Sequence, residues 1–437
     1  MVMGTRGVIQ KSFLLIVMII VAVAFFSSFL QEKTGYAARS SRVINLDGDT
    51  KPVVDGGDQS PSKYAQCTSF SLFDYPFKKQ GGGTLPIYQT SRQLLMDGQL
   101  IVYTFSVDDF YSWSDSSIRI LNTGPDNLLG TADDATPQQL YNPSDKPIYN
   151  IALYKNTLAW IQDDTISTRI KGCQYPTCSS PGIIYDLSNN NWRYRLGHKI
   201  TTTDTFVAWE VQDWNTNGNP FAVLLCPYNA FAPRRGCLNP TQIVTLSVTP
   251  DIERVLSDGL VATQNYIYIL THQNLPTNQI LEQIYLYDLS QKSLSILFSK
   301  THSLDQARLI YNIQAVSIAP AADILYIQRG GEVISGGVTS FRVVNGQMGE
   351  LGPLLPNHFI YFYSASRHND LDFAYYAFEI PSHLYYFGIN SANKNIKIQV
   401  PWNNPVMEIR GHDSTGRNIV YYYLSRGTFN TPYYMHC

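Results

Sequence analysis

The sequence predicts an all-β protein, and composition is the first of three observations behind this prediction. The chain has 437 residues, of which 44 % are hydrophobic and only 15 % charged, and it contains 30 Tyr and 20 Phe. Aromatic and β-branched residues are enriched in strands. The formal net charge of −2 gives no basic surplus for binding phosphate, so nucleic acid is not an expected partner.

The second observation is a short apolar segment that recurs about seven times past residue 100, roughly every 50 residues. Each copy is rich in β-branched and aromatic residues. The copies are residues 101–105 (IVYTF), 158–161 (LAWI), 206–209 (FVAW), 267–270 (IYIL), 324–327 (ILYI), 373–376 (FAYY) and 419–422 (IVYY).

The third observation is that strand-like runs and polar turns, without a convincing helix, fill the space between copies. Repeats of about 40 to 50 residues with four antiparallel strands are typical of β-propeller blades. We therefore predict a propeller with seven blades preferred and six or eight as alternatives. An irregular β-sandwich is the competing architecture, but it does not predict such a period.

A second sequence motif follows most copies of the apolar segment. Residues 184–188 (IYDLS) and 286–290 (LYDLS) are nearly identical and lie two repeats apart. We interpret both as equivalent strand ends, because Asp and Asn side chains accept local backbone hydrogen bonds and open a turn.

The last copy is too short for a complete blade, since few residues follow it. A strand from the N-terminal side, within residues 67–73 (CTSFSLF), is expected to complete this blade and close the ring. Closure removes strand edges that would otherwise pair with other chains.

The N-terminal region predicts export. Residues 13–30 form an uncharged apolar helix preceded by Arg6 and Lys11, which suits either a membrane anchor or a signal peptide. Secretion would follow cleavage near Ala37. The expected divisions are residues 1–30 as this helix, 31–63 as a flexible tether and 64–437 as the propeller, placed outside the cytoplasm and monomeric.

Six cysteines fit three disulfide bridges in an exported chain. Cys173 with Cys178, and Cys226 with Cys237, are close enough in sequence for local bridges across loops. Cys67 and Cys437 remain, at the two positions that ring closure would bring together. We predict all three pairings.

An Asp-rich loop occupies residues 123–134 (TGPDNLLGTADD). Asp126, Asp133 and Asp134 surround a glycine turn and could bind calcium through carboxylate oxygens, although the spacing is not that of an EF-hand. A hairpin tip stabilised by Asp and Gly is the alternative. No other cofactor is expected.

This loop resembles the GPDGxxGTxDD insertion of exported TolB-like propellers, with Asn127 where Gly is usual. Residues 411–421 (GHDSTGRNIVY) are similar to the SPDGxxIVY phrase of the same repeats, and residues 317–326 are a weaker version. The resemblance covers roughly residues 90–437 and implies a propeller. The region before Cys67 is too short for the α/β domain of TolB itself. The hydrolase elbow GxSxG, which accompanies prolyl oligopeptidase propellers, does not occur in this sequence.

For function, we expect a non-enzymatic propeller that binds a protein or a glycan through its loop faces. The alternative is a propeller glycosidase or polysaccharide lyase, with carboxyl groups at the channel mouth drawn from Asp108, Asp109, Glu210 and Asp213. Aromatic residues such as Trp160 and Trp209 could stack on sugars, but at strand spacing they are more often packing between blades.

Overall fold

The computed structural model describes the greater part of residues 68–436. The described residues are 68–72, 89–91, 93–107, 117–126, 128–141, 148–164, 167–178, 181–186, 199–212, 221–227, 237, 239–247, 249, 251–252, 254–276, 278–303, 309–330, 335–353, 360–368, 372–379, 383–389, 395–400, 407–412, 418–423 and 431–436.

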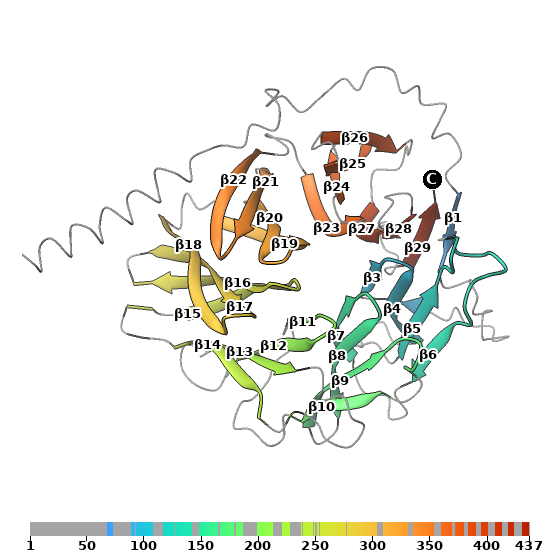
Figure 1. Ribbon diagram of the computed structural model, residues 1–437, viewed down its shortest axis with the longest axis horizontal. Helices are drawn as coiled ribbons and strands as arrows, with labels where there is room; N and C mark the ends of the chain where they lie inside the picture. Colours follow the sequence, from blue (N-terminus) through green and yellow to red (C-terminus); the bar gives the residue numbers. More distant parts are fainter. Residues whose placement is uncertain are drawn as a thin grey trace, which may run out of the picture.

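These residues form seven antiparallel sheets, numbered here in chain order (Figure 1). Sheet 1 contains β2 (Gln89–Thr90), β3 (Leu94–Asp97), β4 (Leu100–Val107), β5 (Ser117–Asn122) and β6 (Gln138–Tyr141). Sheet 2 contains β7 (Ile148–Tyr154), β8 (Thr157–Asp164), β9 (Ser167–Gln174) and β10 (Gly182–Asp186). Sheet 3 contains β11 (Ile200–Thr202), β12 (Phe206–Gln212), β13 (Phe221–Pro227) and β14 (Thr241–Leu246).

The remaining sheets follow the same plan. Sheet 4 contains β15 (Arg254–Ala262), β16 (Tyr266–Leu275), β17 (Gln279–Asp288) and β18 (Ser293–Ser303). Sheet 5 contains β19 (Leu309–Ala319), β20 (Ala322–Gly330), β21 (Ser335–Val344) and β22 (Gln347–Pro353). Sheet 6 contains β23 (Ile360–His368), β24 (Asp372–Glu379), β25 (His383–Ile389) and β26 (Asn395–Val400). Sheet 7 contains β27 (Met407–His412), β28 (Asn418–Tyr423), β29 (Thr431–His436) and β1 (Thr68–Ser71).

Apart from the β2–β4 and β1–β29 pairs, sequential strands pair within each sheet. The sheets succeed one another around the molecule from blue to red in Figure 1. All seven copies of the recurring apolar segment lie on the second main strand of a sheet: β4, β8, β12, β16, β20, β24 and β28. The all-β prediction is confirmed, and the chain has a β-propeller fold.

The interpretation of the second motif, residues 184–188 and 286–290, as equivalent strand ends was wrong, because the two copies end strands at different positions in their sheets. Residues 286–288 end β17, the third strand of sheet 4, whereas residues 184–186 end β10, the fourth strand of sheet 2. The third strand of sheet 2 is β9. Asp favours the turn after any strand. The motif therefore marks the end of a strand but does not indicate the position of that strand in its sheet.

The N-terminal strand β1 pairs with β29 at the outer side of sheet 7, where the sequence places a strand from the N-terminal side (Figure 1). Thr68 pairs with His436 and Ser71 with Tyr433. Beyond β1, the amide of Leu72 donates a hydrogen bond of 2.9 Å to the carbonyl of Pro432.

Apolar clusters lie between sheets 7 and 1 and between each consecutive pair from sheet 1 to sheet 5. The cluster between sheets 2 and 3 includes Trp209, and the cluster between sheets 1 and 2 includes Trp160. Both indole side chains are buried, at 0 % and 2 % exposed. They therefore act in packing and do not stack on a ligand. Another cluster joins sheet 7 to sheet 1 through Tyr422 and Tyr103.

Turns at the ends of first strands contact the next sheet in a repeated way. The carboxylate of Asp97 accepts a 2.6 Å hydrogen bond from the amide of Lys155, and the side-chain oxygen of Asn265 accepts one of 3.0 Å from the amide of Ala321. Lys155 and Ala321 both have positive φ, 48° and 55°. Two pairs of neighbouring sheets therefore share one contact geometry.

The described part of the chain contains no helix long and apolar enough to cross a bilayer. The apolar segment 13–30, the tether 31–63 and the cleavage position near Ala37 lie outside the described residues, so these remain predictions.

Candidate functional site

The Asp-rich loop forms a hairpin that is held by its own carboxylates. Asp133 accepts hydrogen bonds from the amide of Asp126 (3.2 Å) and the hydroxyl of Thr131 (2.6 Å), and Asp134 accepts one from the amide of Gly130 (2.7 Å). Asp126 in turn accepts one from the amide of Leu128 (2.8 Å). These contacts fit the hairpin alternative.

A close backbone approach at Gly124 and a hydrogen bond to sheet 7 also fix this hairpin. Gly124 has a φ of +67°, and a Cβ there would lie 2.6 Å from the carbonyl oxygen of Asp133. The amide of Leu129 donates to the hydroxyl of Tyr434 in β29 (3.2 Å). Within the described residues, no group of three or more His, Cys, Asp or Glu side chains is arranged to hold a metal ion. Calcium at this loop stays a prediction.

Two disulfides lie where the spacing predicts local bridges. Cys173 is bonded to Cys178, and Cys226 is bonded to Cys237. Cys67 and Cys437 lie outside the described residues, so their bridge remains a prediction.

Among the carboxyl groups considered for an enzyme, Glu210 is described, and Asp108, Asp109 and Asp213 lie outside the described residues. Glu210 lies on β12 and is 4 % exposed. Its carboxyl group accepts hydrogen bonds from the amide of Lys199 (3.3 Å) and from the hydroxyl of Ser257 in sheet 4.

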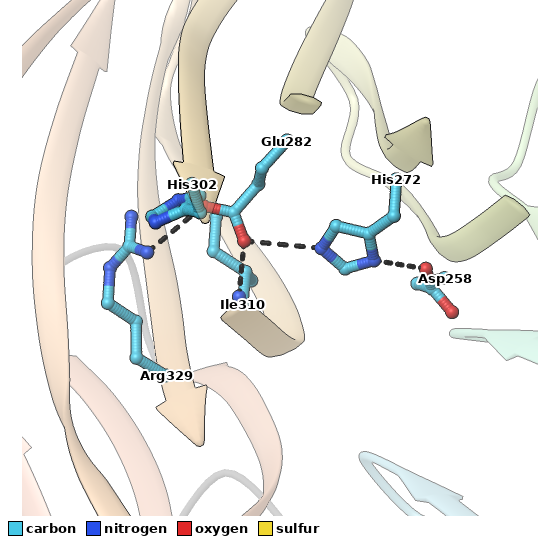
Figure 2. A network of polar contacts seen from close by, with 6 residues as sticks. All are labelled: Asp258, His272, Glu282, His302, Ile310 and Arg329. Atoms are coloured by element: carbon cyan, nitrogen blue, oxygen red, sulfur yellow. Dashed lines mark hydrogen bonds and ion pairs between the residues drawn. The ribbon is translucent and has the colours of Figure 1, made fainter. Parts of the chain in front are cut away.

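The most extensive charged cluster in the described residues surrounds Glu282 of β17, whose side chain is fully buried (Figure 2). Four donors reach its carboxylate. One oxygen accepts from His272 Nε2 (3.2 Å) and from the amide of Ile310; the other accepts from His302 Nε2 (3.2 Å) and Arg329 Nη1 (3.0 Å). Ile310 and Arg329 belong to sheet 5, so Glu282 joins two sheets.

Strand register explains how these residues meet. Glu282 pairs directly with His272 on β16 and with Lys300 on β18. His302 lies two residues beyond Lys300, and alternate residues of a strand share a face. Antiparallel pairing thus brings together three side chains separated by up to 30 positions in the sequence.

The chain of contacts extends from His272 to Asp258, whose carboxylate accepts a hydrogen bond from Nδ1 of the ring (Figure 2). Asp258 lies at a register shift in β15, because Ser257 pairs with Thr271 while Gly259 pairs with the next residue, Leu270. A β-bulge of this kind redirects a side chain and is common beside functional sites. The Asp258 side chain is 38 % exposed, whereas that of His272 is 8 % exposed.

Hydrogen bonds within this network favour the charged forms of Asp258, His272 and Glu282. Burial lowers the pKa of His272, but the hydrogen bonds to Asp258 and Glu282 outweigh it and raise the pKa to about 9. Burial raises the pKa of Glu282, but the His272, Ile310 and Arg329 contacts lower it to about 2. The hydrogen bond and charge of His272 likewise lower the pKa of Asp258 despite its partial burial. His272 is therefore an imidazolium between two carboxylates.

Glu210 behaves differently. Burial is the largest influence and raises its pKa, against opposing contributions from Lys199 and Ser257. The negative charge of Asp258 raises it further. Two neighbouring carboxyl groups thus have pKa values shifted in opposite directions.

Sequence reasoning identified Glu210 but missed Asp258, His272, Glu282, His302 and Arg329. The histidines are scattered in sequence and match no metal-ligand spacing. The available signal was the presence of polar residues after the apolar segments of β16 and β20, as in THQ and QRG. Their convergence depends on register and on the bulge.

Comparisons with known proteins identify only the fold. No protein-family model matches the chain, and no curated protein matches it. Acylaminoacyl peptidase of Pyrococcus horikoshii is similar in structure, with 11 % identity, a TM-score of 0.50, and coverage of 79 % of this chain and 51 % of that one. This chain therefore spans about half the length of that peptidase.

Two other solved structures are more distant. The β-propeller domain of the Trilobed protease from Pyrococcus furiosus has 11 % identity and a TM-score of 0.49, covering 79 % of this chain and 95 % of that one. The fucose-specific lectin of Aleuria aurantia has 12 % identity and a TM-score of 0.38, covering 73 % and 99 %. At such identities the similarity concerns the fold alone.

Proposed function

We propose that this chain is an extracytoplasmic, non-enzymatic propeller of the TolB-like kind, with seven blades in a closed ring. It binds a protein or a glycan through its loop faces. It acts as a monomer, associated with a membrane through residues 13–30 or secreted after cleavage near Ala37.

Contacts between innermost strands support the ring. The strands β3, β7, β11, β15, β19, β23 and β27 each contact the next one, and β27 contacts β3. The pairing of β1 with β29 supports closure by the N-terminal strand. Thr68 and His436, which are paired, are adjacent in sequence to Cys67 and Cys437, and this supports the third disulfide.

The two local disulfides support the compartment, because such bonds persist in oxidising environments outside the cytoplasm. Non-reducing peptide mapping of the exported protein tests the compartment and the ring together. We expect a linked peptide containing Cys67 and Cys437, and an N-terminal peptide that shows whether cleavage follows Ala37. Free thiols at both positions would contradict closure.

The observation that favours binding over catalysis is the state of His272. Both ring nitrogens hydrogen-bond to carboxylates, and the raised pKa keeps the ring protonated at neutral pH. An imidazolium held on both sides has no lone pair with which to act as a general base. The network therefore provides no general base, which favours a binding role over a catalytic one.

Ligand binding by the full-length protein tests this function. The protein is purified under oxidising conditions and applied to a glycan array, and is separately photo-crosslinked to proteins on the surface of cells that produce it. We expect saturable binding to a glycan or to one protein, with the ligand recovered unchanged, and heat-unfolded protein as the control. Absence of saturable binding in both assays would contradict the proposal.

A glycosidase is the second candidate, because of Glu210 and Asp258. Glycoside hydrolysis uses one protonated and one ionised carboxyl group, and the opposite pKa shifts of this pair fit that requirement. The burial of Glu210 and its two hydrogen bonds oppose this assignment. Release of reducing sugar from bound glycan, abolished by Glu210→Gln, would favour the enzyme over the binding protein.

A further inference from the structure

Asp258 is the most exposed member of the Glu282 network, at 38 % against 30 % for Arg329, and it carries a charge. One carboxylate oxygen accepts the His272 hydrogen bond. Within the described residues, no other hydrogen bond reaches this side chain, which is 38 % exposed. The second oxygen is therefore available to a ligand.

The network holds this carboxylate in place. His272 is fixed by Glu282, which is fixed by donors from β18, β19 and β20 (Figure 2). A rigid acceptor loses little conformational entropy when it binds a ligand, so preorganisation favours affinity. The bulge at Asp258 gives the side chain its direction on the innermost strand of sheet 4.

Sheets 3 and 4 both supply groups near Asp258. Ser257 donates to Glu210, which links β15 to β12 beside the bulge. Lys199 is half-buried and lies beside the same carboxyl group as Ser257, because its amide donates to Glu210 (3.3 Å). Its charge also acts on Glu210 and Asp258. Thr271 pairs with Ser257 and so shares its face of sheet 4. The Thr271 hydroxyl is fully buried and has no hydrogen-bond partner among the described residues.

The charges indicate the ligand class. A cationic ligand would meet the positive charges of Lys199 and His272, and an anionic ligand would meet Asp258. A neutral polyhydroxylated ligand avoids both repulsions, because a sugar hydroxyl can donate to the Asp258 carboxylate and accept from the Lys199 ammonium group.

We propose that Asp258 and Lys199 form a binding site for a neutral sugar at the junction of sheets 3 and 4. This inference rests on the proposed binding function and narrows its ligand to a neutral glycan at one named position.

The test uses the full-length protein and an array of neutral oligosaccharides, followed by calorimetric titration of the best-binding one. Asp258→Asn keeps an amide oxygen for the His272 hydrogen bond but replaces the accessible carboxylate oxygen. We expect at least tenfold weaker binding and a single cooperative thermal unfolding transition, whose midpoint falls by a few degrees because His272 loses one of its two carboxylate partners. Lys199→Gln, which removes the ammonium group but none of the side-chain hydrogen bonds of the Glu282 network, is expected to weaken binding in the same way.

Asp204→Asn is the matched control. This carboxylate lies in the turn between β11 and β12 and is similarly exposed, at 46 %. We expect it to bind the oligosaccharide as the unaltered protein does. Equal loss in the Asp204 and Asp258 variants would overturn the site, as would normal binding by both the Asp258 and Lys199 variants.

The outcomes separate the two proposals. If no neutral oligosaccharide binds but a protein or a charged glycan does, the sugar site is wrong and the binding function stands. If nothing binds at all, both are wrong.

Discussion

Two buried carboxyl groups lie in the contact between sheets 4 and 5, and they differ in the charge of their partners. Glu282 accepts hydrogen bonds from Arg329 and two histidines, and its pKa falls to about 2. The hydrogen-bond partners of Asp323 are neutral and include Thr263 (2.5 Å), Asn265 (2.7 Å) and Tyr268 (2.9 Å). Burial outweighs these donors and raises its pKa to about 6.

The comparison shows that burial and the number of hydrogen bonds do not alone decide the direction in which a pKa shifts. Both carboxyl groups are 0 % exposed, and both accept at least three hydrogen bonds. Cationic donors stabilise the ionised form, whereas neutral donors compensate only part of the desolvation. One interface therefore contains a carboxylate with cationic donors, Glu282, and a carboxyl group with neutral donors, Asp323, which becomes protonated below about pH 6.

The largest expected effect follows from neutralising Glu282. Glu282→Gln leaves His272 and Arg329 without their common counter-ion, and breaking a buried ion pair in this way costs about 3 to 5 kcal/mol. Urea unfolding at pH 7 measures the free energy of unfolding. A loss below about 1 kcal/mol would mean that the ionic contact contributes little.

A smaller loss of stability is expected from substituting Gly259. This residue lies on β15 between Asp258, which belongs to the Glu282 network, and Thr263, which donates to Asp323. A Cβ there would come within 2.9 Å of Ile313 Cγ1 in sheet 5 and 3.2 Å of Leu270 Cβ. Overpacking of this kind costs about 1 to 3 kcal/mol, so Gly259→Ala is expected to destabilise by that amount. In a double-mutant cycle with Ile313→Ala, the combined loss should be less than the sum; strict additivity would contradict the close approach.

The pH dependence of stability should distinguish the two carboxyl groups. Glu282 has a folded pKa below its ordinary value of 4.5, so its contribution is complete above pH 4.5 and is lost as the pH falls towards 2. His272 has a raised pKa, so its contribution is complete below pH 6.5 and is lost as the pH rises through 9. Unfolding midpoints in urea from pH 2 to 10 should therefore fall at both ends, and Glu282→Gln should flatten the acid limb.

In acid, the contribution of Asp323 to stability should change with pH in the opposite direction to that of Glu282. Its folded pKa of about 6 exceeds the ordinary 3.8, so its protonated form favours folding, and this contribution is lost as the pH rises from 3.8 to 6. Asp323→Asn resembles the protonated form and should change stability at pH 7 by about 1 kcal/mol or less, since hydroxyl donors can reorient. A loss as large as that of Glu282→Gln would show that the two contacts are equivalent.

Much of the fold could be predicted from the sequence because the blades repeat. Apolar segments such as residues 267–270 recur at a regular spacing, and each lies on an equivalent strand. Residues 184–188 misled the assignment, because an Asp-terminated strand end occurs on third and fourth strands alike.

The charged site was less predictable, for a physical reason. Glu282, His272 and His302 meet only when two strand pairings have a particular register, and Asp258 joins them only through a bulge. Neither register nor bulge position follows from hydrophobic periodicity. Glu210 was identified as a carboxyl group, but its partner Ser257 comes from another sheet.

The most direct measurement of the central claim is the ionisation of His272 in solution. Nitrogen NMR of the full-length protein labelled with ¹⁵N at histidine, with His272 assigned by comparison with His272→Gln, follows both ring nitrogens from pH 5 to 10. The ionic network predicts that both nitrogens stay protonated through neutral pH and titrate near pH 9. Titration between pH 6 and 7, leaving one nitrogen unprotonated at neutral pH, would contradict the network and restore His272 as a candidate base.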